Sequence, residues 1–148
     1  MIVDYEPEHL LEIRHQDWQR GANQTIEHAR SLTLGHCAYT AICNDTKRPL
    51  VCAGIAELWT GTAMCWASFD VDARSVIVEA HRRTRQELDR APFKRLEMYV
   101  LPGFWQAWRW AHMLGFQVEC LKECGSPDGR DIYVFKRIKR GQATRRLK

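Results

Sequence analysis

The sequence lacks any apolar run near the roughly 20 residues that a helix needs to cross a bilayer. Its acidic start, Met1 to Glu8, also lacks the pattern of a secretory signal. The six cysteines include no C-x-x-C pair, and four of them lie in apolar stretches where a small buried thiol is usual. These absences argue against a membrane protein, a disulfide framework and a structural metal site. We therefore expect a cytoplasmic protein without a metal.

Acidic residues are absent from Lys136 to the end, a segment with seven Lys or Arg. The preceding residues hold fifteen basic and eighteen acidic side chains. We interpret residues 1–138 as a single domain, since the length suits one, and residues 139–148 as a basic tail. A solvated tail is the simpler interpretation. Binding of nucleic acid or an acidic partner is the alternative, and the acidic body disfavours nucleic acid.

Hydrophobic periodicity predicts an α/β fold with a mixed sheet and helices on both of its faces. Short turns join the first three strands, which favours an antiparallel meander, and Gly54 inside the second indicates a bulge or the close approach of another group. The helix before the fourth strand allows a parallel crossover, and the last two strands form a closing hairpin. Helices are expected over 9–20, 25–34, 74–90 and 104–116, and strands over 37–43, 50–59, 63–70, 95–101, 117–123 and 132–138.

Helix starts are marked by residues that can cap them. Thr25 can cap the second helix, and Asp72 or Ser75 can cap the third. The fourth helix follows the break Pro102-Gly103 and ends at Leu114-Gly115-Phe116. It is rich in Trp.

A single carboxylate, Glu97, interrupts the otherwise apolar strand 95–101. Such a strand is covered on both faces, so a charge within it must be paired, shifted in pKa or exposed to a cleft. Arg95, Arg109 or a helix end could pair with it. The sequence leaves open whether Glu97 serves a site or only the core.

The order of elements resembles that of the GCN5-related N-acetyltransferase (GNAT) superfamily over residues 2–138. Its most specific marks are Ala107 with Leu114-Gly115-Phe116, the strand Leu96-Glu97-Met98, and the closing run from Asp128 to Phe135. More narrowly, the Trp-rich helix and small size look like acetyltransferase-like proteins of tailed bacteriophages. That narrower likeness would place the protein in the host cytoplasm or the virion.

The resemblance implies that strand 63–70 splays from strand 95–101 and that acetyl-CoA inserts its pantetheine arm between them. The residues implied to contact the arm are Trp66, Ala67, Ser68 and Phe69. Arg74 and Ser75 fall where the family binds the pyrophosphate, at the start of the next helix. The acceptor would be an amine of a protein or a small molecule.

Amine acetylation needs a base, and Glu97 matches the family's strand carboxylate. Glu57 is a second candidate, with an exposed strand-end charge as its simpler interpretation. His112 could protonate the leaving thiolate, although a surface position suits it better. Trp59 and Trp105 are candidates for contact with a substrate or partner.

The sequence departs from the family pattern at three places. The loop 71–76 contains no glycine, Ala111 replaces the family's general-acid Tyr, and Phe104 replaces its helix-start Asn. Two functions therefore stay open. One is a GNAT-like N-acyltransferase. The other is a catalytically inactive phage structural or host-interaction protein of the same fold, with a partner surface around Trp105 and the tail.

Overall fold

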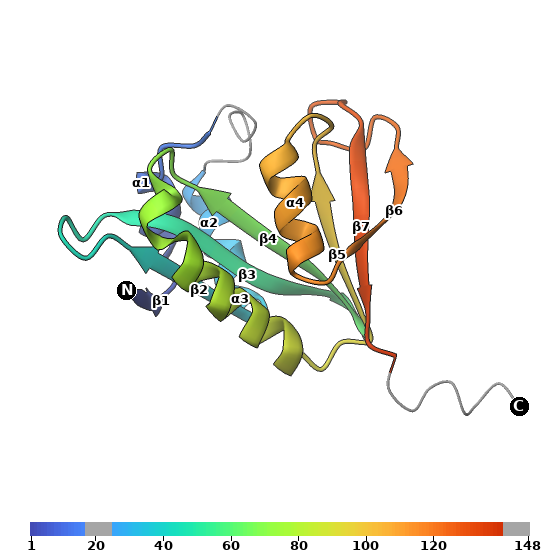
Figure 1. The fold of residues 1–148 in the computed structure, drawn as a ribbon, viewed down its shortest axis with the longest axis horizontal. Helices are drawn as coiled ribbons and strands as arrows, with labels where there is room; N and C mark the ends of the chain where they lie inside the picture. The colour runs from blue at the N-terminus through green and yellow to red at the C-terminus, as the bar shows by residue number, and fades with distance from the viewer. Residues whose placement is uncertain (17–24, 141–148) are drawn as a thin grey trace, which may run out of the picture. The chain divides into compact units, whose positions relative to one another are not determined.

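The structure is a computed structural model that describes residues 1–16 and 25–140. Its strands form one seven-stranded mixed sheet in the order β1-β2-β3-β4-β5-β7-β6 (Figure 1). The mixed α/β fold predicted from the sequence is confirmed. The elements are β1 (Ile2–Asp4), α1 (Pro7–Glu12), α2 (Ile26–Ser31), the 3₁₀ turn η2 (Leu32–Leu34), β2 (Cys37–Ile42), β3 (Pro49–Trp59), β4 (Thr62–Phe69), the 3₁₀ turn η3 (Ala73–Val76), α3 (Ile77–Arg90), β5 (Arg95–Val100), α4 (Trp105–Met113), β6 (Gln117–Lys122) and β7 (Ile132–Ile138).

Contacts divide the chain into two compact units. The first unit comprises residues 1–56 and 65–91, and the second comprises residues 57–64 and 92–148. Beyond Arg140, the predicted basic tail lies outside the described residues. Within the described part of the chain, no helix has the length and apolar character to span a membrane.

The first unit has a core on each face of its strands. β2 pairs antiparallel with both β1 and β3. On one face, η3 and α3 pack through Ala73, Val76 and Ala80, and the Tyr39 hydroxyl donates a hydrogen bond to the Ala80 carbonyl at 2.9 Å. The other face carries a second cluster supplied by α1 and the residues that flank it, by α2 and by β3: Tyr5, Leu10, Ile13, Ala29 and Cys52. The expected helices on both faces are therefore present, and α3 crosses in front of β2 and β3 in Figure 1.

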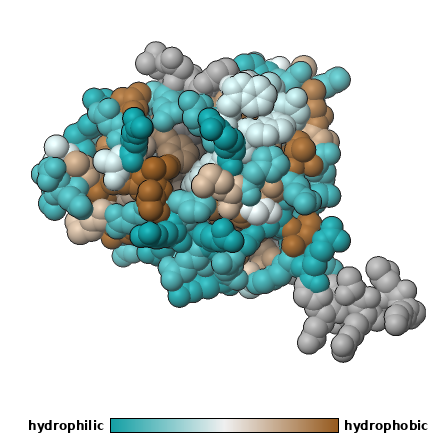
Figure 2. Space-filling model, viewed as in Figure 1, coloured by the Kyte–Doolittle hydropathy of each residue, from teal (hydrophilic) through white to brown (hydrophobic). Residues whose placement is uncertain are grey.

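The second unit places β7 between β5 and β6. The first residues of β4 run parallel to β5, while β7 is antiparallel to both β5 and β6. This confirms the parallel crossover and the closing hairpin. α4 packs through Trp108, whose ring lies edge-on to Tyr133 and Phe135 at centroid distances of 4.9 Å. The surface drawn in Figure 2 is largely hydrophilic, with scattered apolar patches.

The end of α4 explains the Leu-Gly-Phe signature. The Gly115 N–H donates to the His112 carbonyl and the Phe116 N–H donates to the Ala111 carbonyl, both at 3.0 Å. This is the Schellman pattern, which needs a left-handed residue, and Gly115 has φ of +88°. Phe116 then turns inward and is buried. The motif both ends the helix and anchors it to the core.

One expectation about the N-terminal segment was wrong, and one element there was missed. The helix expected over 9–20 ends at Glu12, because the next residues bond to Asp70 instead of continuing the helix. The Arg14 N–H donates to Asp70 Oδ2 at 2.9 Å, and the Arg14 carbonyl accepts the Val71 N–H at 3.0 Å. Residues 17–20 of that expected helix lie outside the described residues. The short strand β1 was not predicted.

Of the two predicted helix caps, one is present and one is absent. Thr25 caps α2 as expected, accepting the His28 N–H at 3.2 Å. The expected cap of α3 by Asp72 or Ser75 does not form, because a 3₁₀ turn begins at Ala73 and α3 follows from Ile77. The Asp72 carboxylate is engaged elsewhere, with Arg14 Nη2 at 2.6 Å.

Candidate functional site

Glu97 lies half-buried in the middle of β5. Arg95 Nε donates a hydrogen bond to its Oε1 at 2.8 Å, and the Tyr99 hydroxyl lies 3.5 Å from its Oε2. Strand alternation puts these three side chains on one face of β5. The register opposes Met98 to Phe135, so the face that α4 covers is the other one. Glu97 therefore points away from α4.

Arg95 links Glu97 to a wider network. Its Nη1 and Nη2 donate to the two carboxylate oxygens of Glu119 at 2.9 and 2.8 Å, and Lys136 Nζ lies 3.3 Å from Glu119. Hydrogen bonds to Glu119 and then Glu97 raise the pKa of Arg95, and the bond from Arg95 lowers the pKa of Glu119. The pairing of Glu97 with Arg95, an alternative left open by the sequence, is present.

A β-bulge brings Glu119 into this network. The register between β6 and β7 runs from Val118 opposite Phe135 to Cys120 opposite Val134, which leaves Glu119 as the extra residue. Sequence alternation cannot reveal a bulge, and Glu119 was not among the candidate residues.

Tyr99 is a candidate that the sequence reasoning missed. Its side chain is partly exposed, and burial, then the charge of Glu97, raises its pKa. The phenol therefore keeps its proton at neutral pH and can act as a donor. The spacing of Tyr99, two residues from Glu97 on one strand, was the signal available in the sequence.

Three of the four β4 residues expected to contact a cofactor arm use their side chains for packing. Trp66 lies edge-on to Tyr5 with a centroid distance of 5.5 Å, and its buried indole N–H has no hydrogen-bond partner within residues 1–16 and 25–140. Ala67 and Phe69 pack against the core that η3 and α3 cover. Contact with a ligand at Trp66, Ala67 and Phe69 would therefore fall mainly to the backbone. It stays a prediction.

The parallel register of β4 and β5 is short. It comprises three pairs, from Thr62 opposite Arg95 to Met64 opposite Glu97, although β4 continues to Phe69 and β5 to Val100. Glu97 thus stands at the last pair of this register.

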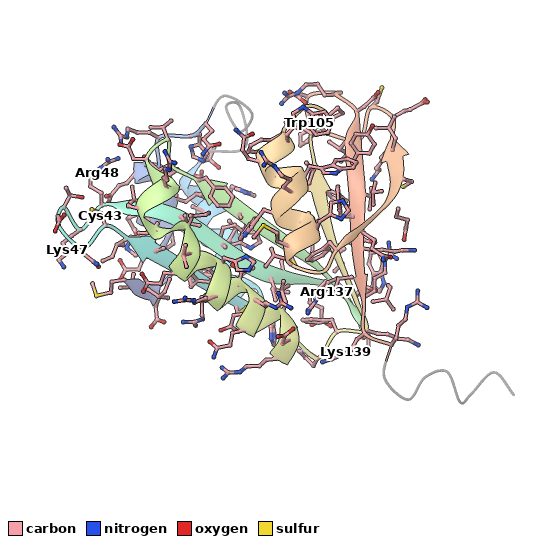
Figure 3. The ribbon with its side chains drawn as sticks, viewed as in Figure 1. Cys43, Lys47, Arg48, Trp105, Arg137 and Lys139 are labelled. Atoms are coloured by element: carbon pink, nitrogen blue, oxygen red, sulfur yellow. The ribbon has the colours of Figure 1, made fainter. Side chains whose placement is uncertain are left out.

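The remaining candidate residues are exposed. Glu57 lies near the exposed end of β3, as its simpler interpretation predicted, and Arg74 and Ser75 lie on the surface of η3. Trp59 and Trp105 are 64% and 62% exposed. Figure 3 shows Trp105 at the start of α4. The structure thus groups Glu97 with Arg95 and Tyr99 and does not add Glu57 to that group.

A second polar cluster surrounds Asp70 at the end of β4. This fully buried carboxylate accepts from Arg14 Nη2 at 3.1 Å, from Arg48 Nη2 at 3.3 Å and from the Asp72 N–H at 2.9 Å. Burial opposes ionisation, but the hydrogen bonds from Arg14 and from the backbone outweigh it and lower the pKa of Asp70. The cluster ties together three segments that are distant in sequence.

Replacing Asp70 with Asn should lower the free energy of unfolding by about 2 kcal/mol at pH 7, since hydrogen bonds to a buried charge are lost. The pKa of Asp70 is lower in the folded state than in the unfolded chain, where Asp titrates near 3.9. The contribution of the ionised Asp70 to the free energy of unfolding is therefore complete above the unfolded-state pKa, and it is lost as the pH falls through the lower folded-state pKa. Urea unfolding of both proteins should show the gap closing below about pH 4. An equal gap at pH 7 and pH 3 would contradict this account.

Positions that carry polar groups in the resembling family are apolar here and belong to the core. Ala111 is fully buried and Phe104 nearly so. His112 is exposed, with its ring near Trp108 and Phe135. Chemistry that needs a proton donor must therefore use another group.

The comparisons with known proteins identify the fold. No protein-family model matches the chain, and no curated protein matches it significantly. Among solved structures, a GNAT-family acetyltransferase from Bacillus anthracis superposes with a TM-score of 0.65 at 12% identity, covering 93% of each chain. The yncA protein from Salmonella typhimurium, solved with acetyl-CoA, gives 0.72 at 14% identity, covering 97% of this chain and 95% of that one. The ribosomal-protein-S18-alanine N-acetyltransferase from Escherichia coli gives 0.71 at 16% identity, covering 97% of both.

The chain therefore has the fold of the GNAT-family acetyltransferases. Identities of 12–16% show the fold alone. The resemblance inferred from the sequence is confirmed at that level. The narrower likeness to phage proteins stays a prediction.

Proposed function

We propose that the protein is an N-acyltransferase that moves an acetyl group from a thioester donor, acetyl-CoA in the first instance, to an amine of a protein or small molecule. One observation carries the proposal. A half-buried carboxylate, Glu97, stands at the last pair of the parallel β4–β5 register, on the face of β5 away from α4. The fold is that of acetyltransferases, and a carboxylate in this place suits a general base.

The residues around Glu97 suit the proton transfers of the reaction. An ammonium group first gives one proton to Glu97, so that the amine nitrogen has a free lone pair. The nitrogen then bonds to the thioester carbonyl carbon, the C–S bond breaks, and the sulfur leaves as a thiolate. The thiolate takes one proton from a hydroxyl donor, and the second nitrogen proton, released as the amide forms, restores that donor. Glu97 passes its own proton to water.

Arg95 and Tyr99 have different roles beside the Glu97 carboxylate. Arg95 binds Oε1 and orients the group, while Oε2 faces the Tyr99 hydroxyl. Tyr99, protonated at neutral pH, is the nearest hydroxyl donor for the thiolate. It would replace the Tyr that the family carries where this chain has Ala111.

Replacing Tyr99 with Phe should lower kcat about 10²-fold, the low end of the range for general acid–base catalysis. The free energy of unfolding should change little, because the hydroxyl makes one long contact at the surface. Steady-state kinetics and urea unfolding of the same preparation separate the two effects. A variant with unaltered kcat would exclude Tyr99 as the proton donor.

Two measurements test the function. Acetyl-CoA and acetyl-pantetheine are added separately in a thermal-shift titration, and saturable binding should raise Tm by mass action. Release of the free thiol is then followed with a panel of amines and peptides, with mass spectrometry of the acceptor. Amine-dependent thiol release with acetylation of the acceptor supports the proposal. An unchanged Tm at millimolar concentrations of both thioesters would contradict the proposed function.

The second candidate is a GNAT-fold protein without catalysis, whose partner is a phage or host protein. It is favoured by the exposed Trp105 and by the apolar residues Phe104 and Ala111. It expects no Tm shift with either thioester and no thiol release. The two titrations therefore separate it from the enzyme.

A further inference from the structure

The segment between β4 and α3 has its own hydrogen-bond acceptors. The Val71 N–H donates to the Arg14 carbonyl at 3.0 Å, the Asp72 N–H to Asp70 Oδ1 at 2.9 Å, and the Ala73 N–H to the Asp70 carbonyl at 3.0 Å. Loops that lead into helices bind phosphates with N–H groups of this kind. Here three consecutive N–H groups are already engaged within the protein.

The Asp70 carboxylate also takes up nearby positive charge. The guanidinium groups of Arg14 and Arg48 both donate to it. Arg14 additionally binds the exposed Asp72 carboxylate, and Glu79 lies in the first turn of α3. A diphosphate approaching this start of the helix would meet two exposed carboxylates, Asp72 and Glu79, and would find Arg14 already bonded to Asp70 and Asp72.

Two buried side chains hold the backbone of residues 71–76 against the core of the first unit. Ala73 and Val76 are buried in the core of the first unit, and η3 leads directly into α3. Residues 62–102 contain no glycine. A ligand phosphate could therefore come close to the backbone at Ala73 and Val76 only by displacing packed side chains, and no glycine opens the backbone elsewhere in the segment.

We infer that the protein recognises its acyl donor without binding the diphosphate. The Asp70 carboxylate sets this specificity because it already occupies the donors of Arg14, Arg48 and the Asp72 N–H that could otherwise bind an anion. The inference rests on the proposed acyl transfer. The donor class is a pantetheine thioester. Its source is either an acyl-CoA whose nucleotide makes no stabilising contact with this loop, or a pantetheine arm attached to a carrier protein.

The wild-type protein tests this with three donors and one competitor. Acetyl-pantetheine should be used with kcat/KM within about threefold of acetyl-CoA, and 3′-phosphoadenosine 5′-diphosphate at millimolar concentration should leave Tm unchanged. A still higher kcat/KM with an acetylated acyl carrier protein would identify the carrier as the source; equal values for acetyl-pantetheine and acetyl-CoA with no gain from the carrier would identify acyl-CoA.

A preference of more than 100-fold for acetyl-CoA over acetyl-pantetheine, or a Tm rise with the nucleotide, would overturn the inference. Absence of transfer from all three donors contradicts the proposed function instead, and the nucleotide titration still decides the inference because it needs no turnover.

A variant tests the role of Asp70 directly. In Asp70→Ala, the two guanidinium groups and the Asp72 N–H lose their acceptor, so inorganic pyrophosphate should bind and raise Tm by several degrees. Asp72→Asn is the matched control, since it removes an exposed carboxylate and keeps Asp70; it should not respond. An equal response of the wild type and Asp70→Ala would show that the carboxylate does not exclude the anion. If Asp70→Ala does not fold, the wild-type pyrophosphate titration decides alone, with a Tm rise counting against the inference and no rise supporting it.

Discussion

Replacing Glu97 with Gln should lower kcat for acetyl transfer by 10²- to 10⁴-fold, roughly the contribution of a general base. Glutamine has nearly the same shape and can still accept the Arg95 Nε hydrogen bond, but it cannot take the ammonium proton. KM for the donor should change little, because the substituted atom does not bind the thioester. Steady-state kinetics with varied amine and donor give both constants.

Glu119→Gln is the matched control for this variant. It removes the other carboxylate of Arg95, bound at 2.8 and 2.9 Å, and keeps Glu97. Its kcat should stay within about threefold of the wild type. An equal loss in both variants would mean that the charge network matters only for structure. Full activity of Glu97→Gln would leave Glu97 as a structural partner of Arg95.

Replacing Gly54 with Ala should lower the free energy of unfolding by about 3 kcal/mol, because overpacking a filled core is costly. A Cβ at this position would lie 2.5 Å from the Cys37 carbonyl oxygen and 2.8 Å from Cζ2 of Trp66. The first contact is backbone of the neighbouring strand, which cannot move without breaking the β2–β3 register. Urea unfolding monitored by Trp fluorescence gives the loss.

Gly61→Ala is the informative comparison. Gly61 has φ of +87°, and an added Cβ would meet nothing within 4 Å. Its cost comes only from the left-handed backbone, about 1 kcal/mol. A loss at Gly54 no larger than the loss at Gly61 would refute the steric account.

The parts of the fold that follow from local chemistry could be predicted. The break at Pro102-Gly103 and the helix end at Leu114-Gly115-Phe116 depend on residues close in sequence, and the structure confirms both. Gly54 indicated the close approach of another group, and the Cys37 backbone and the Trp66 ring are that group. Periodicity alone was enough to place the central strand.

Features that depend on distant contacts could not be predicted. The first helix stops early because Arg14 bonds to Asp70, 56 residues away. For the same reason the sequence placed Asp70 at the end of the expected strand 63–70 but did not indicate its hydrogen bonds from Arg14 and Arg48. Within the site, Glu97 was found as a charge in an apolar run, whereas Glu119 depends on a bulge that alternation conceals.

The bulge at Glu119 has a further consequence for the outer edge of the sheet. β6 ends the strand order and is exposed along its whole length, so its outer backbone could serve as a template for another strand. The bulge bends that edge between Val118 and Cys120, and Glu119 and Lys122 add charge beside it. An incoming strand would lose its register after a few residues. The irregularity that supplies Arg95 with its second carboxylate also protects this edge against aggregation.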